Sequence, residues 1–157
     1  ERGFSLQSAG AVVTIFWWSV IGGRMIVGLI TSRIKTFKIM LSISILGAIS
    51  VVFMALSTPA YLVYTFTALA GLGYSGLFPL MVSSGTQIFK QSRGIIITII
   101  FAASSLGKAI TPYIIDLSSR LSLFFSVIMA AVFMALTVIL LIIFSQSRAS
   151  FIFMYRK

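Results

Sequence analysis

Five long runs of apolar residues constrain the fold more than any other feature of the sequence. They span approximately residues 9–30, 39–56, 60–83, 94–115 and 121–144. A bilayer core needs about 20 apolar residues to be crossed by a helix, so each run is long enough to span it. In lipid, a helix satisfies every backbone amide within its own segment. The sequence therefore predicts an all-α integral membrane protein whose 157 residues form one transmembrane bundle of five helices, followed by a tail at 145–157.

The composition excludes several kinds of chemistry. Of the residues, 59% are hydrophobic and only 9% are charged, whereas a soluble domain is about 25% charged. Cysteine and histidine are absent, and the only acids are Glu1 and Asp116. This removes Cys/His metal sites and histidine-dependent catalysis, so we expect no metal, no cofactor and no enzyme. A serine–lysine pair, Ser104 or Ser105 with Lys108, is the one catalytic arrangement left, but serines in membrane helices more often serve packing.

The charges follow the loops. The first loop carries Arg33, Lys35 and Lys38, the second (57–59) is uncharged, the third carries Lys90 and Arg93, the fourth carries Asp116 and Arg120, and the tail carries Arg148, Arg156 and Lys157. Short loops rich in Lys and Arg stay in the cytoplasm. We therefore expect a multi-pass protein of the cell (inner) membrane with its N-terminal end outside and its C-terminal end inside. The net charge of +10 lies in these loops, so we expect lipid and not nucleic acid as the partner.

A polar stripe marks the fourth apolar run. Residues at spacings of three and four share one helix face, and here that face holds Phe101, Ser104, Ser105, Lys108, Thr111, Pro112 and Asp116. Lys108 lies about 12 Å from Asp116 at 1.5 Å per residue, close to the middle of the membrane. A lysine at that depth requires a partner and usually marks a functional site. Its partner is a carboxylate outside this chain, a bound anion or a water-filled cavity.

Small residues and a proline interrupt the third run. Gly71, Gly73 and Gly76 are followed by Phe78 and Pro79. Two interpretations stay open: close helix packing through small faces, or a helix that bends near mid-membrane beside a substrate path.

Arg24 and two tryptophans stand out in the first run. Arg24 lies about two turns before the inner end of that run, where a structural clamp on nearby helix ends is favoured over a substrate contact. Trp17 and Trp18 lie near mid-span, and because they are adjacent, one of them is expected to point away from lipid and to line a cavity.

Three stretches resemble the major facilitator superfamily of transporters, most closely its fucose–galactose–glucose:proton symporter (fucose permease-like) branch. The likeness runs from about Gly3 to Phe144. The matching stretches are Gly23-Arg24 through Gly28 to Arg33 (eighth span and following loop), Leu77-Phe78-Pro79-Leu80 with Ser83-Ser84-Gly85 (tenth span), and Gly107 through Pro112 with Asp116 (eleventh span).

The resemblance implies that the chain supplies the eighth to twelfth helices of a twelve-helix symporter. A missing N-terminal half would carry the acids that bind a coupling proton, and a small-molecule substrate would move by alternating access. Lys108, Ser104, Ser105, Thr111, Trp17, Trp18 and Phe78 would form the substrate path; Arg24, Gly28, Arg33, Gly73, Gly76, Pro79, Pro112 and Asp116 would serve structure or gating.

The sequence departs from that branch at Ser32, Phe78 and Lys108. Ser32 replaces an aspartate, Phe78 stands where sugar-transporting relatives carry a tyrosine, and Lys108 lies in a stretch that is otherwise uncharged. A small anionic metabolite is therefore an alternative to a sugar. A non-transporting five-helix membrane subunit, or a truncated remnant, is the alternative to a transporter.

Overall fold

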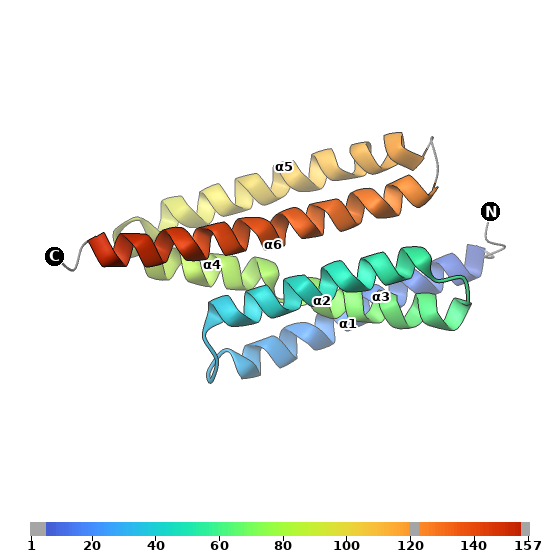
Figure 1. Ribbon diagram of the computed structural model, residues 1–157, viewed down its shortest axis with the longest axis horizontal. Coiled ribbons are helices and arrows are strands. Elements are labelled where there is room, and N and C mark those ends of the chain that lie inside the picture. The colour runs from blue at the N-terminus through green and yellow to red at the C-terminus, as the bar shows by residue number, and fades with distance from the viewer. Residues whose placement is uncertain (1–5, 120–122, 155–157) are drawn as a thin grey trace.

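The computed structural model describes residues 6–119 and 123–154, and these residues form helices joined by short connections (Figure 1). The helices are α1 (Leu6–Ile30), α2 (Thr36–Leu56), α3 (Ala60–Ser75), α4 (Leu77–Ile88), the short 3-10 helix η1 (Lys90–Ser92), α5 (Arg93–Ser119) and α6 (Leu123–Met154). Five stretches of the described residues are long and apolar enough to cross a membrane, with α3 and α4 together forming one of them. The predicted all-helical membrane fold with five spans is confirmed.

Three predicted helix ends differ from the structure by more than a turn. The fourth span does not end at Ile115 but continues to Ser119, so Asp116 lies in α5 and not in the following loop. The third span does not end at Ser83 but continues to Ile88, because a helix in lipid keeps its backbone bonded until it reaches the interface. The last helix continues to Met154, which places part of the predicted tail, 145–157, in α6. With 32 residues, α6 is about 48 Å long, well beyond a hydrocarbon core of about 30 Å.

The third span is broken at Gly76, between α3 and α4. Proline has no N–H, so Pro79 cannot donate to the carbonyl of Ser75 one turn earlier. The helical ladder resumes with the bond from Leu80 N to Gly76 O, at 3.0 Å. The structure shows the interruption at Gly76 together with close packing of Gly71, Gly73 and Gly76 against neighbouring helices, whereas the substrate path beside it stays a prediction.

The helix α3 lies at the centre of the packing. It contacts α1 on one side and α2 on the other; α2 contacts α6, α6 contacts α5, and α5 contacts α4. Glycine makes the α2–α3 crossing possible: a Cβ added to Gly73 would collide with the backbone of Gly47 and lie 2.8 Å from Ile43 O. Small residues of this kind let membrane helices approach until their backbones touch.

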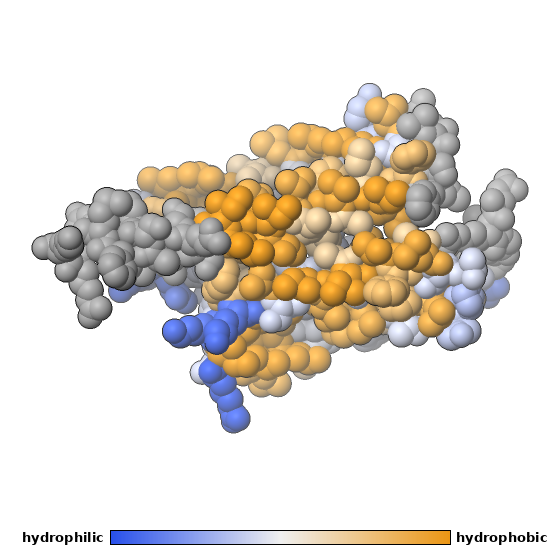
Figure 2. Space-filling view, in the orientation of Figure 1, coloured by the Kyte–Doolittle hydropathy of each residue, from blue (hydrophilic) through white to orange (hydrophobic). Residues whose placement is uncertain are grey.

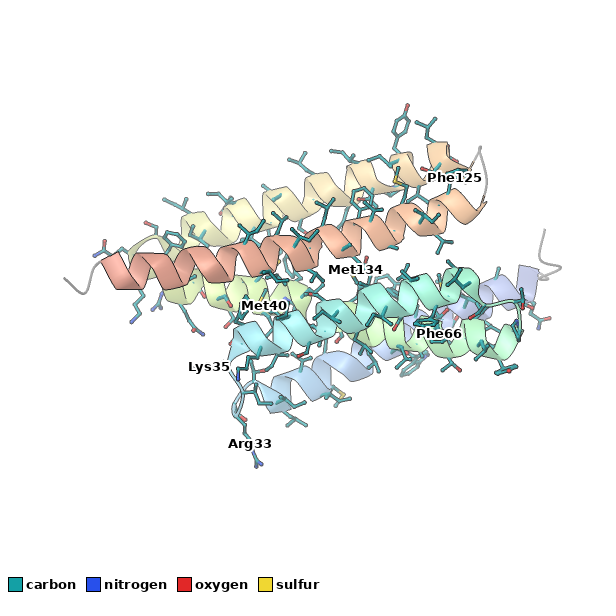
Figure 3. All side chains as sticks on the ribbon, viewed as in Figure 1. Arg33, Lys35, Met40, Phe66, Phe125 and Met134 are labelled. Carbon is teal, nitrogen blue, oxygen red and sulfur yellow. The ribbon has the colours of Figure 1, made fainter. Side chains whose placement is uncertain are left out.

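Much of the outer surface is apolar. Figure 2 shows apolar residues over most of the viewed face, with hydrophilic residues gathered where α1 connects to α2. Arg33 and Lys35 project from that connection (Figure 3). The α4–α5 connection lies at the same end of the molecule, whereas the uncharged α2–α3 connection lies at the other (Figure 1). The basic connections are thus gathered at one end of the bundle.

Candidate functional site

The aromatic ring of Phe78 and the ammonium group of Lys108 meet where α4 and α5 pack together. Lys108 Nζ lies 5.9 Å from the centroid of the Phe78 ring, within the range of a cation–π contact. Phe101 packs edge-on against the same ring, with the centroids 5.0 Å apart. Two of the predicted substrate-path residues, 30 positions apart in the sequence, are therefore brought together.

The local sequence explains why Phe78 occupies this position. Gly76 ends α3, and α4 begins at Leu77, so Phe78 lies in the first turn of a new helix segment. Lys108 lies about 22 Å from the start of α5 and about 16 Å from its end, at 1.5 Å per residue. The contact is thus formed well inside the membrane span, beside the break in the third span.

The other α5 residues predicted for the substrate path lie within about one turn of Lys108 along the helix. Ser104 and Thr111 are half-buried, and Ser105 is exposed. Pro112 lies inside α5 and has no N–H to donate to the carbonyl of Lys108, four residues earlier. Lys108 therefore presents a positive charge and, on the same residue, a carbonyl oxygen that has lost its helical donor.

Asp116 does not neutralise Lys108. It is the one carboxylate within residues 6–119 and 123–154, and it lies about 12 Å along α5 from Lys108. The Lys108 side chain is exposed, and the partner found for it within the described chain is the uncharged ring of Phe78. The same residues contain no group of three or more His, Cys, Asp or Glu side chains that could hold a metal ion.

Arg24 contacts the broken end of α3. Its Nε donates a hydrogen bond of 3.3 Å to the backbone carbonyl of Ser75, the carbonyl that Pro79 deprives of its helical partner. Gly23 makes this approach possible, because a Cβ there would lie 2.6 Å from Ser75 Cβ. This is a contact of the kind that a clamp on a helix end requires.

The other predicted residues lie apart from this pair. Trp17 and Trp18 are 58% and 70% exposed and belong to α1, which lies at the opposite edge of the bundle from α5 (Figure 1). Trp17 packs edge-on against Phe16, at 5.7 Å. A Cβ at Gly28 would meet nothing within 4 Å, so no close helix contact explains that glycine.

Sequence reasoning missed a groove between α1 and α2. It encloses about 470 Å³ and is lined almost entirely by apolar side chains, with Lys38 near one end. The two helices that form its walls are consecutive in the chain, yet both pack on α3 instead of on each other. Hydrophobicity alone carries no signal for such a groove, because lipid-facing and groove-facing positions are equally apolar.

The helices, the apolar surface and the composition together define a multi-pass, all-helical membrane protein. Among curated proteins, the chain is similar to the glucose/mannose transporter GlcP of Bacillus subtilis (strain 168), with 30% identity over 107 residues. The matched region covers 68% of this chain and 26% of GlcP, so the chain spans about a quarter of that transporter's length. No protein-family profile and no solved structure matches the chain.

Proposed function

We propose that the chain is the C-terminal part of a secondary active transporter of the major facilitator superfamily, from its eighth to its twelfth span. The contact between Lys108 and Phe78 in the middle of the spans carries this proposal, because ionisable residues at that depth mark functional sites such as substrate or ion pathways. The similarity to GlcP over 107 residues supports it. The missing N-terminal half would complete the solute path by alternating access.

The solute path passes between α4 and α5. Lys108 and Phe78 contact the solute, and the hydroxyls of Ser104, Ser105 and Thr111 lie within about a turn of Lys108 on the same helix. Trp17 and Trp18 lie on α1, at the opposite edge of the bundle from α5, and are not part of this path. A hexose suits such a site, because its C–H face packs on an aromatic ring while its hydroxyls exchange hydrogen bonds with serine and threonine.

The break at Gly76 gives the path a movable element. A helix interrupted near mid-membrane can bend there without breaking the rest of its ladder. Arg24 and Pro79 set the geometry of the break, and Pro112 loosens α5 at the same depth. The residues proposed for structure or gating also include Gly28, Gly73, Arg33 and Asp116. They position the helices and their loops.

The orientation and the coupling belong to the same proposal. The basic connections at one end of the bundle (Figure 1) lie in the cytoplasm, which places the start of α1 outside. Coupling is to protons, with the titrating acids in the N-terminal half. The solute is a sugar, as the name of GlcP suggests, or a small anionic metabolite.

The test is uptake by the complete protein in proteoliposomes. Reading the coding frame upstream of Glu1 comes first: about seven further spans support a transporter, whereas a stop codon and no partner chain support a five-helix subunit or remnant. The purified protein is then loaded into vesicles, and uptake of labelled hexoses is measured with and without an inward proton gradient. Uptake that is absent for every solute, or that Lys108→Ala leaves unchanged, contradicts the proposed site.

A further inference from the structure

The charge of Lys108 calls for a counter-charge that the described chain does not provide. The ammonium group lies near the middle of a span, where an unpaired charge is strongly unfavourable. The Phe78 ring at 5.9 Å offsets only part of that cost, since a ring has a quadrupole and no net charge. Asp116 lies about 12 Å along the helix from Lys108.

The groups beside the ammonium are those that recognise a polyol. Phe78 is held edge-on by Phe101 at 5.0 Å, so it presents a fixed ring on which the C–H face of a monosaccharide can pack. Pro112 frees the carbonyl of Lys108 as an acceptor, and Ser104 and Thr111 add hydroxyls on the same helix face. A neutral sugar would use the ring and the acceptors but would leave the ammonium group without a partner.

We propose that the transported solute is a monosaccharide bearing one carboxylate, and that Lys108 Nζ binds that carboxylate while Phe78 packs on the sugar ring; this rests on the transporter function proposed above. The charge count favours a single negative charge. Arg24 and Lys108 are the cations that lie well inside the described spans, and Arg24 Nε donates to Ser75. A phosphate ester carries about −1.5 to −2 at neutral pH, more than one ammonium group balances.

The experiment compares three labelled solutes in proteoliposomes of the complete transporter: glucose, glucuronate and glucose 6-phosphate. Wild type is expected to take up glucuronate with a kcat/KM at least about tenfold above that for glucose. Lys108→Gln should lower the value for glucuronate at least about tenfold and lower that for glucose by a clearly smaller factor, because glucose has no carboxylate whose charged partner is lost. Lys108→Arg should retain the preference, and Lys35→Gln, which removes a loop charge, is the matched control.

Each other outcome is decisive. Uptake of glucose without glucuronate, or a Lys108→Gln variant that loses both equally, overturns the charge-recognition proposal and leaves the transporter function intact. Preference for glucose 6-phosphate overturns the carboxylate assignment. Absence of all uptake overturns the transporter function itself and this inference with it. Gel filtration of each variant in detergent establishes that a loss of uptake does not come from misfolding.

Discussion

Arg24 Nε donates a hydrogen bond to the carbonyl of Ser75, which is the carbonyl left without its helical donor by Pro79. The two residues are 51 positions apart and lie on α1 and α3. A freed carbonyl inside a bilayer is costly unless another group satisfies it. Arg24 of α1 thus stabilises the break in the third span by bonding the carbonyl of Ser75. In turn, the break supplies the acceptor for the Arg24 side chain.

This dependence predicts coupling between Arg24 and Pro79. Arg24→Met should lower the stability of the complete protein by about 1 kcal/mol, the net value of a typical hydrogen bond. Pro79→Ala restores an N–H that can donate to Ser75, so the loss caused by Arg24→Met should shrink in that background. A double-mutant cycle of thermal unfolding in detergent measures the coupling. Additive losses would show that Arg24 acts on something other than this carbonyl.

The α2–α3 crossing should not tolerate a side chain. Gly73→Ala places a Cβ against the backbone of Gly47, and such overpacking destabilises by about 1–3 kcal/mol. Gly71→Ala should behave alike, since its Cβ would lie 2.6 Å from Phe16 O. Gly107→Ala is the matched control, because a Cβ there meets nothing within 4 Å. Melting temperatures in detergent provide the comparison, and equal values for Gly73→Ala and Gly107→Ala would contradict the crossing.

Removing the charge of Lys108 should raise the thermal stability of the protein and lower its uptake of the solute. Lys108→Met keeps the length of the side chain and removes a charge from mid-membrane, so the melting temperature without solute should rise. The rise corresponds to part of the roughly 2.5–3.5 kcal/mol that a central lysine costs. Uptake of the solute should fall at the same time. A lower melting temperature would indicate that the ammonium is paired with a group in the rest of the transporter.

The orientation can be tested with single cysteines, since the chain contains none. Thr58→Cys, in the uncharged α2–α3 connection, should react with a membrane-impermeant maleimide in intact cells. Lys35→Cys should react only after the membrane is opened, because basic loops stay in the cytoplasm. The rest of the complete protein is first freed of cysteine. The reverse labelling pattern would invert the proposed topology.

The spans were predictable and their mutual arrangement was not. Run length and hydropathy locate a helix in lipid without tertiary information, so all five spans were found. When every side of a helix is apolar, the sequence carries little information about which side contacts which neighbouring helix. Gly22 and Gly23 show this: only Gly23 lies against Ser75, and a Cβ at Gly22 meets nothing within 4 Å.

The candidate site was predicted residue by residue but not as a contact. The cost of its charge singles out Lys108, whereas Phe78 enters the predicted path through the resemblance, at a position where sugar-transporting relatives carry a tyrosine. That the two meet depends on how α4 packs on α5, which sequence spacing does not encode. Trp17 and Trp18 are assigned to the path because they are adjacent near mid-span, so that one of them should face away from lipid, and the structure places them at the far edge of the bundle, on α1.

The contact between Gly73 and Gly47 has a mechanical consequence. Where two backbones touch with no side chain between them, no change of rotamer can let one helix slide past the other. A shift along α3 would bring Leu72 or Tyr74 against α2, so the crossing acts as a fixed pivot. The first three helices are therefore expected to move as one body, and α4 is tied to it by Leu80, which is buried against Val27, Ile39 and Met40.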